Sequence, residues 1–272
     1  MTLVDTHVHV WDATRLHYPW LDANPELPRV VSPIATDTAA IFVQADCVPE
    51  QGIAEVRYIE SLDWPALAGI VAFAPLEASA VPSALEELAA HPLVVGVRRL
   101  LQAEPAGFAT SASFVAGLTA VARLGLVFDA TVRADQLDEL VRVSRTVPEL
   151  VIVLDHLGNP PLAEGLDSAA GQNWLRSIRA LASRPGVVAK LSGAVAGDER
   201  GGLPFALAAL DTFGPDRLLL GSDHPLTVPH DAEAYQQWVA TADAALGLTA
   251  AERAAVRHDN AIRTYGLKEI PT

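Results

Sequence analysis

Eight short, almost continuously apolar runs recur along the chain, and turn residues bound each of them. The runs cover residues 3–10, 40–45, 69–74, 93–98, 126–132, 150–154, 187–191 and 217–221. Consecutive Val, Ile and Leu residues, as at 151–154 and 218–220, are typical of strands with both faces buried. The pattern therefore predicts eight strands of a parallel sheet that helices cover.

Segments with apolar residues at helical spacing separate most of these runs. They cover residues 82–90, 113–124, 134–146, 172–183, 203–213 and 232–246. Eight alternations of strand and helix in about 250 residues indicate an α/β fold of the (β/α)8 TIM barrel type, with residues 1–272 in one domain. An open doubly wound sheet is the alternative, but residues 5–9 do not resemble its glycine-rich phosphate turn.

Composition and charge narrow the classes of partner. The 272 residues are 50% hydrophobic and 19% charged, which suits a folded domain with a substantial core. A formal net charge of -14 would repel nucleic acid and anionic membranes, so neither is an expected partner. Cys47 is the single cysteine, and residues 1–10 lack the apolar stretch of an export signal. We therefore expect a cytoplasmic protein with a small-molecule partner, and the sequence also allows a homo-oligomer.

Polar residues gather where the predicted strands end. In a (β/α)8 barrel, the carboxyl ends of the strands form the face that carries the chemistry. These positions hold His7, His9, Gln44, Asp46, Arg98, Arg99, Asp155, His156, Lys190, Ser192, Ser222, Asp223 and His224. We expect the active site at this face, with the long loop 18–33 over its mouth.

His7 and His9 have the spacing of a ligand pair. On a strand, side chains two residues apart leave the same face about 7 Å from each other, and their rings can converge on one ion. Taken alone, such a pair is more typical of buried, hydrogen-bonded histidines. His156 and Asp223 end other strands of the same barrel, which favours a shared site. The candidate ligands of a shared metal site are therefore His7, His9, His156 and Asp223.

A second group of residues is suited to binding a substrate. Lys190 interrupts an apolar strand, where it can form a structural ion pair or contact a substrate hydroxyl or carboxylate. Asp129 is interpreted as a buried structural carboxylate. Trp20 can form an aromatic wall over a sugar or pyranone ring, or pack its own loop. The candidate substrate-binding residues are Arg98, Lys190, Gln44, His224 and Trp20.

Four ordered motifs resemble the amidohydrolase superfamily, specifically amidohydrolase-related family 2. They are VDTHVHVWD at 4–12, LDHLGNPP at 154–161, AKLSG at 189–193 and LGSDHP at 220–225. The chain is similar to the branch that contains the sugar-acid lactonases and 2-pyrone-4,6-dicarboxylate lactonase. The similarity reaches NAIRTYGL at 260–267 and so spans nearly the whole chain.

The resemblance implies a hydrolase whose candidate catalytic residues are Asp223, which activates water, and His156. The histidines that match His7, His9 and His156 would polarise the scissile carbonyl, directly or through one divalent metal ion, with Zn2+ as the expected ion. Some members of this branch turn over without a metal, so the resemblance leaves the need for an ion open.

Departures from the superfamily pattern oppose a binuclear centre. Many members carry a His at the end of strand five and a metal-bridging Lys on strand four, where this chain has Asp129 and Arg98. His224 also stands where many sugar lactonases have Trp.

The function expected from these residues is the opening of a small lactone, of the sugar-acid or pyrone dicarboxylate type. Asp223 would deprotonate water and return the proton, while Arg98 and Lys190 orient carboxylate or hydroxyl groups. One alternative is metal-dependent, non-oxidative decarboxylation of a small aromatic or unsaturated acid. Another is a non-catalytic sugar-acid binding protein, although such a protein has no need of the base that Asp223 supplies.

Overall fold

Eight parallel strands form the central sheet of the computed structural model, within the residues that the structure describes, 3–193 and 201–268. They pair in the order β1 (Val4–Val8), β4 (Ala39–Val43), β5 (Leu67–Phe73), β6 (Val94–Arg98), β7 (Val127–Ala130), β8 (Ile152–Leu154), β9 (Val187–Leu191) and β10 (Leu218–Leu220). Parallel pairing of Val8 with His224 joins the first strand to the segment after the last. Asp223 N also donates to the carbonyl oxygen of His7 over 2.9 Å. These contacts close the sheet, and the predicted (β/α)8 barrel is confirmed.

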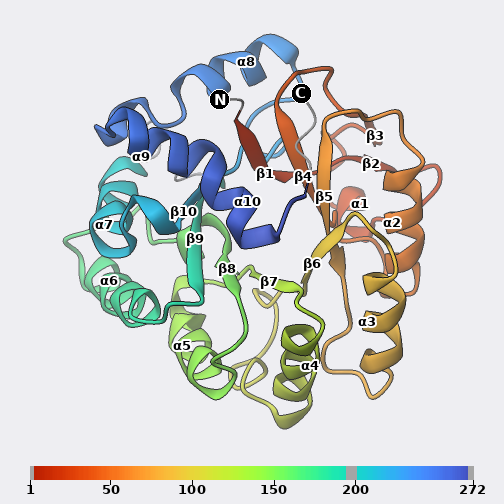
Figure 1. The fold of residues 1–272 in the computed structure, drawn as a ribbon, viewed down its shortest axis with the longest axis horizontal. Coiled ribbons are helices and arrows are strands. Elements are labelled where there is room, and N and C mark those ends of the chain that lie inside the picture. Colours follow the sequence, from red (N-terminus) through yellow and green to blue (C-terminus); the bar gives the residue numbers. More distant parts are fainter. Residues whose placement is uncertain (1–2, 194–200, 269–272) are drawn as a thin grey trace.

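Helices surround the strands as an outer ring (Figure 1). They are α2 (Gly52–Glu60), α3 (Val81–Ala89), α4 (Ala112–Arg123), α5 (Leu137–Thr146), α6 (Ala169–Ala182), α7 (Leu203–Phe213) and α8 (Ala232–Thr241). All six helices expected from the sequence form, although α8 ends five residues early and the turn η7 (Ala244–Leu246) follows it. The apolar pattern missed α2 because its buried face includes Gly52 and Glu55 as well as Val56 and Ile59.

The first strand contains an irregularity that decides which way its side chains point. Val4 and Val8 would share a face of a regular strand. Here Val4 packs in the barrel interior and Val8 packs outside it, because β1 has one extra residue relative to β4 between Asp5 and Val8. The shift turns His7 and His9 toward the interior, where His7 meets Asp155.

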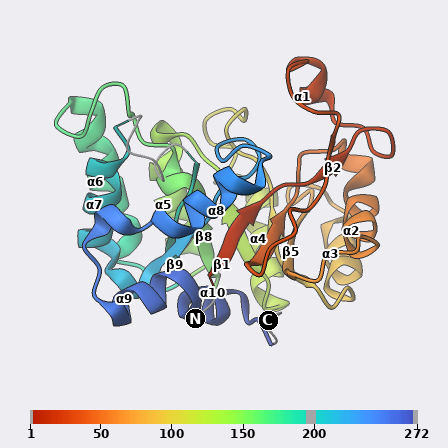
Figure 2. The ribbon, with the colours of Figure 1, turned by 90° about the horizontal axis from the view of Figure 1, so that it is seen from above.

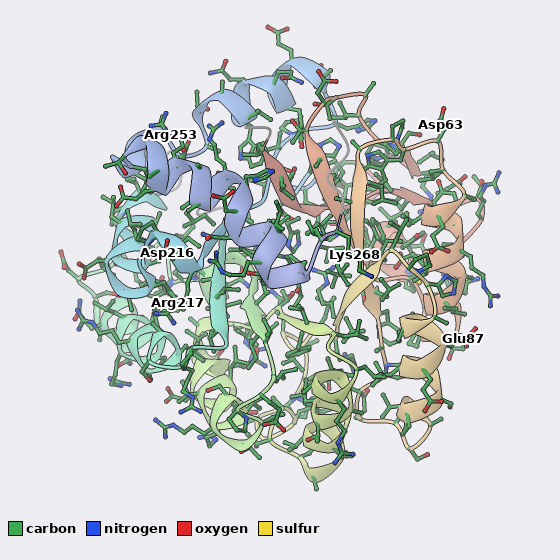
Figure 3. The ribbon with its side chains drawn as sticks, in the orientation of Figure 1. Asp63, Glu87, Asp216, Arg217, Arg253 and Lys268 are labelled. Carbon is green, nitrogen blue, oxygen red and sulfur yellow. The ribbon has the colours of Figure 1, made fainter. Side chains whose placement is uncertain are left out.

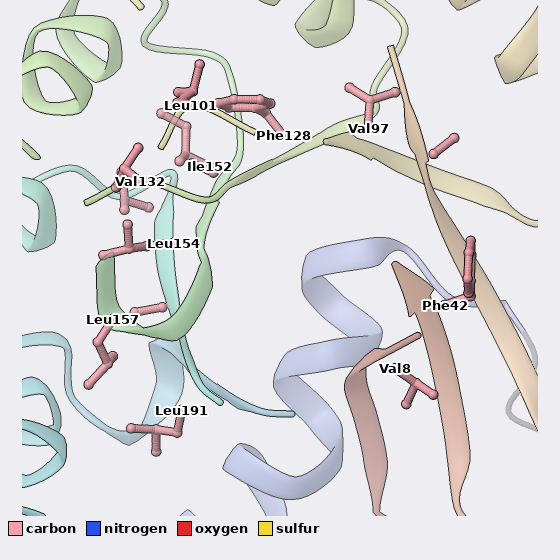
Figure 4. Close-up of a cluster of buried hydrophobic side chains, with 14 of the residues drawn as sticks. Val8, Phe42, Val97, Leu101, Phe128, Val132, Ile152, Leu154, Leu157 and Leu191 are labelled. Carbon is pink, nitrogen blue, oxygen red and sulfur yellow. The ribbon is translucent and has the colours of Figure 1, made fainter. Parts of the chain in front are cut away.

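Two apolar clusters hold the barrel together. The larger one fills the space between strands and helices, and Figure 4 shows Phe42 of β4, Val97 of β6 and Phe128 of β7, which belong to this cluster. The smaller one lies inside the barrel and includes Ile41, Val71, Val153 and other strand residues. Such double-sided burial explains why the strands read as continuous apolar runs.

The last helices close the amino-terminal end of the barrel. The chain passes through α9 (Ala250–Ala254) and the π-helical turn η8 (Ala255–Asp259) into α10 (Asn260–Tyr265), which lies across this end (Figures 1 and 2). Ala261, Tyr265 and Leu267 join the interior cluster. Both ends of the described chain also lie on this side (Figure 2).

The opposite end carries the long first connection. It contains the antiparallel pair β2 (Trp11–Asp12) and β3 (Val30–Val31) and the short helix α1 (Pro19–Asp22), which project away from α10 (Figure 2). Acidic groups such as Asp63 and Glu87 lie on the periphery, outside the ring of strands (Figure 3). Among the described helices, none has both the length and the hydrophobicity needed to cross a membrane.

Candidate active site

Strained backbone marks the carboxyl ends of three strands. Asp46 after β4, His156 after β8 and Asp223 after β10 have φ angles of 60°, 51° and 55°. Left-handed conformations cost residues other than glycine about 1–3 kcal/mol, and they gather at functional sites because they aim side chains. All three side chains line one cavity of about 430 Å³.

This cavity brings together several of the residues predicted for the site. His9, Trp20, Arg98, His156 and Asp223 lie in its lining. Trp20 donates from Nε1 to the carbonyl oxygen of Ala45 over 2.8 Å, and its ring meets the ring of Trp11 edge to face at 5.2 Å. The two indoles give the cavity an apolar wall beside its polar floor.

Three ligand atoms converge at the floor of the cavity. Side-chain atoms of His7, His9 and Asp223 all lie within 4.8 Å of one another. His9 Nδ1 lies 2.7 Å from the carbonyl oxygen of Val43, so Nδ1 carries the proton and the Nε2 lone pair faces Asp223 Oδ1 at 3.6 Å.

His7 completes this set from below. Its Nδ1 lies 3.3 Å from Asp155 Oδ1, while its Nε2 is buried, has no hydrogen-bond partner among the described residues and lies 3.8 Å from Asp223 Oδ1. Carboxylate and carbonyl partners on the outer ring nitrogens are typical of histidines that bind a metal. The two Nε2 atoms and the Asp223 carboxylate therefore fit one divalent cation.

His156 lies beside this set rather than within it. Its ring centroid is 4.6 Å from that of His7, and its Nδ1 lies 2.9 Å from Ser192 Oγ. Gly193 is packed against the same ring, since a Cβ there would lie 2.8 Å from His156 Nδ1. The ring is thus confined at the cavity wall, and its part in metal binding stays a prediction.

The environment of Asp223 keeps its carboxyl group ionised. Burial by itself would raise the pKa of Asp223, but the neighbouring His156, His9 and His7 together hold that pKa well below its usual value of 3.8. Thr227 Oγ1 donates to Oδ2 over 2.7 Å. Oδ1 is left facing the two imidazoles, in the position of a base.

Lys190 supports the site from inside the barrel and is absent from the cavity lining among the described residues. Its Nζ lies 2.5 Å from Asp129 Oδ2 and 3.1 Å from Asp155 Oδ1. Tyr265 donates to Asp129 over 3.0 Å. The structural ion pair considered for Lys190 is the arrangement observed, in place of direct contact with a substrate, because β9 aims this side chain below the cavity floor.

Gln44 and His224 also lie behind the surface that a substrate would touch. Gln44 is fully buried, accepts from Asp46 N through Oε1 over 2.6 Å, and takes a hydrogen bond from Arg98 on its carbonyl oxygen. His224 has both ring nitrogens engaged, with the Val228 carbonyl oxygen and with His230 Nδ1, each at 3.0 Å. The sequence predicted that both would contact a substrate, whereas the structure places both outside the cavity lining among the described residues. The direction of each side chain depends on how its strand ends.

Comparison with known proteins defines the family. A family model described as amidohydrolase matches residues 4–267. The chain belongs to the amidohydrolase family. This match covers nearly the whole chain and confirms the predicted amidohydrolase-superfamily hydrolase.

Relatives of this amidohydrolase support the lactonase branch. It is 32% identical to an L-fucono-1,5-lactonase of Burkholderia multivorans, over 98% of this chain and 96% of that protein. The crystal structure of an amidohydrolase from the same species with bound zinc has a TM-score of 0.78 and 31% identity, covering 98% of this chain and 100% of that one. A dihydroxybenzoic acid decarboxylase from Polaromonas sp. JS666 with bound manganese has a TM-score of 0.68 and 14% identity, covers 98% of each chain, and shares the fold alone.

Asp5 of the amidohydrolase holds the site together although sequence reasoning gave it no role. Its Oδ1 accepts from His7 N over 3.1 Å and from Ser222 N over 2.9 Å, and its Oδ2 accepts from Tyr235 over 2.8 Å. The carboxylate thus ties the segment of His7 to that of Asp223. Its place inside the first motif was the available signal. Gln102 and Asn159 of the cavity lining were missed because they stand in loops beyond the strand ends.

A buried acid on α2 supports the cavity wall. Glu55 Oε1 accepts from Ala45 N and from the Tyr18 hydroxyl, each over 3.1 Å. Burial raises the pKa of Glu55 from 4.5 to about 7. This carboxyl therefore titrates near neutral pH in the folded protein.

Glu55→Gln should change how stability depends on pH. The unfolded chain ionises Glu55 above about pH 4.5, whereas the folded protein keeps it protonated to about pH 7, so the wild type loses stability across this window. Glutamine stays neutral at the same size. The unfolding free energy of the variant relative to wild type should rise by roughly 2 kcal/mol between pH 5 and pH 8. Urea denaturation at both pH values measures it, and a difference that does not vary with pH contradicts the raised pKa.

Proposed function

We propose that this amidohydrolase opens a small lactone by hydrolysis, with a sugar-acid lactone or a pyrone dicarboxylate as substrate. The observation that carries the proposal is an ionised Asp223 that faces two imidazole Nε2 atoms at the floor of a substrate-sized cavity. The 32% identity to an L-fucono-1,5-lactonase supports the same reaction class.

Asp223 acts as the proton carrier of the reaction. Its carboxylate takes a proton from water as the water oxygen bonds to the lactone carbonyl carbon. The bond from that carbon to the ring oxygen then breaks, and the same carboxyl returns the proton to the leaving alkoxide. The product is an open hydroxy acid, which ionises at neutral pH.

His7, His9 and Asp223 are the residues that would hold a divalent cation. When bound there, the ion would supply Lewis-acid polarisation of the lactone carbonyl. His156, confined at the cavity wall beside Ser192, stabilises the developing negative charge. Arg98 and Trp20 contact the remainder of the substrate, Arg98 as a hydrogen-bond donor and Trp20 through its apolar face.

A screen of aldonolactones and pyrone dicarboxylates in weak buffer with a pH indicator tests the proposal. We expect acid release from at least one lactone class, a fall in rate with chelator, and recovery with added Zn2+. Release of carbon dioxide from a small aromatic acid, without lactone opening, would replace the proposal with decarboxylation. Tight lactone binding with no acid release would indicate a binding protein.

A further inference from the structure

Asp46 presents an acid to the cavity that the proposed mechanism does not use. Its side chain is exposed, lines the cavity, and has no hydrogen bond or ion pair with any other described residue. The backbone of Asp46 is nevertheless fixed, with φ at 60° and its N–H donating to Gln44 Oε1 over 2.6 Å. The fold thus holds a carboxylate in one place through a costly conformation and leaves its oxygens free to accept.

Arg98 does not neutralise this carboxylate through a direct contact. Its guanidinium donates to the carbonyl oxygen of Gln44 and to Thr131 Oγ1, the latter over 3.5 Å, and lies 3.9 Å from Asp155 Oδ2. Only 4% of Arg98 is exposed. Its guanidinium is therefore mostly buried, and among the described residues Asp155 is the one carboxylate within 4.0 Å of it.

The remaining lining offers few cations to an anionic substrate. Arg98 is the one arginine or lysine among the described residues that line the cavity, whereas Asp46 and Asp223 are both acids. Lys190 is fully buried between two carboxylates. Among the described residues, a lactone with its own carboxylates would meet two acids, Asp46 and Asp223, with Arg98 as the one arginine or lysine to pair with, and like charges at close range oppose binding.

Hydroxyl groups suit the same surface well. An ionised carboxylate accepts hydrogen bonds without donating, and such charge-assisted bonds are about twice as strong as neutral ones. Gln102 and Asn159 add amide groups to the lining, and Trp20 adds an apolar wall. This combination matches an uncharged ring that carries hydroxyls on its edge and C–H groups on its face.

We propose that Asp46 determines substrate specificity, by accepting hydrogen bonds from hydroxyls of a neutral sugar lactone and repelling lactones that carry carboxylates. This inference rests on the proposed lactone hydrolysis. Asp46 acts on binding and orientation, and the proton chemistry belongs to Asp223.

Asp46→Asn tests the inference with little change of shape, because asparagine also tolerates the left-handed backbone. With a neutral aldonolactone, kcat/KM should fall about 10-fold or more, mainly through KM. With 2-pyrone-4,6-dicarboxylate or a glucarolactone, it should rise, so that the ratio of the two values moves by about 100-fold. In the wild type, high salt should also reduce the ratio of kcat/KM for the neutral lactone to kcat/KM for the carboxylated one, because salt screens the repulsion.

Asp63→Asn is the matched control, since it removes one negative charge from an exposed position on the periphery (Figure 3). It should leave both kcat/KM values unchanged. The inference is overturned if Asp46→Asn keeps the wild-type ratio at an unchanged melting temperature, or if the wild type prefers the dicarboxylate.

Binding measurements separate this inference from the proposed function. If the wild type opens no lactone, the proposed function fails. Isothermal titration calorimetry can then still compare how tightly the wild type and Asp46→Asn bind the neutral aldonolactone and the dicarboxylate. A neutral lactone that binds about 10-fold more weakly to Asp46→Asn supports the inference. Equal binding to both proteins overturns it.

Discussion

Asp223→Asn should lower kcat for lactone opening by about 10²- to 10⁴-fold, the usual effect of removing a proton-transfer base. Asparagine keeps the shape of the side chain and can still accept from Thr227. It cannot take a proton from water, however, and it brings no negative charge to the facing imidazoles. Initial rates by pH indicator or stopped flow, with the lactone that the wild type uses best, measure the effect.

The loss should appear in kcat with little change in KM, because Asp223 serves the transition state more than it holds the substrate. Asp63→Asn removes the same charge from the periphery and should retain wild-type rates. Metal content of both variants should be measured, since Asp223 is also a candidate ligand. Full turnover by a well-folded Asp223→Asn protein would reject Asp223 as the base.

The barrel could be predicted from the sequence because each strand is buried on both faces. Val151-Ile152-Val153-Leu154 is one example, with Ile152 and Leu154 in the outer cluster and Val153 in the inner one. The C-terminal helices escaped prediction because they cover an end of the barrel rather than its side. Tyr265, for example, reaches into the interior and binds Asp129.

The sequence predicted those site residues that stand at the carboxyl ends of the strands. His9, Arg98, His156 and Asp223 all line the cavity from such positions. The direction of a side chain depends on backbone detail that composition does not show. The extra residue in β1 turns His7 inward, and left-handed φ angles aim Asp46 and Asp223. Lys190 lies on a regular strand instead, and the alternation of side chains along β9 directs it into the barrel interior, below the floor of the cavity.

Lys190→Met should lower the free energy of unfolding by about 3–5 kcal/mol, since removing one partner of a buried ion pair leaves the other uncompensated. Lys190 is fully buried and contacts both Asp129 and Asp155. Methionine has a similar length but brings no charge, so both carboxylates would remain beneath the active site without this cation. Urea denaturation followed by circular dichroism measures the change.

Lys268→Met provides the matched control, because Lys268 is the other lysine of the chain and is exposed (Figure 3). It should change stability by no more than about 0.5 kcal/mol. A second substitution, Asp129→Asn, should restore part of the stability of Lys190→Met, because it removes one of the two unpaired charges. Equal losses from the two lysine variants would contradict the buried ion pair.

The loss of unfolding free energy in Lys190→Met, relative to wild type, should also depend on pH. Burial already raises the pKa of Asp129 to about 6 with Lys190 present, although the ammonium opposes the shift. Without the ammonium, that pKa rises further, and the folded variant takes up a proton that the unfolded chain releases above about pH 4. The variant should therefore lose stability steadily as pH rises from 5 to 8, and its deficit against wild type should be smallest at the acid end. A deficit that is constant over this range would mean that Lys190 stabilises the barrel by packing rather than by charge.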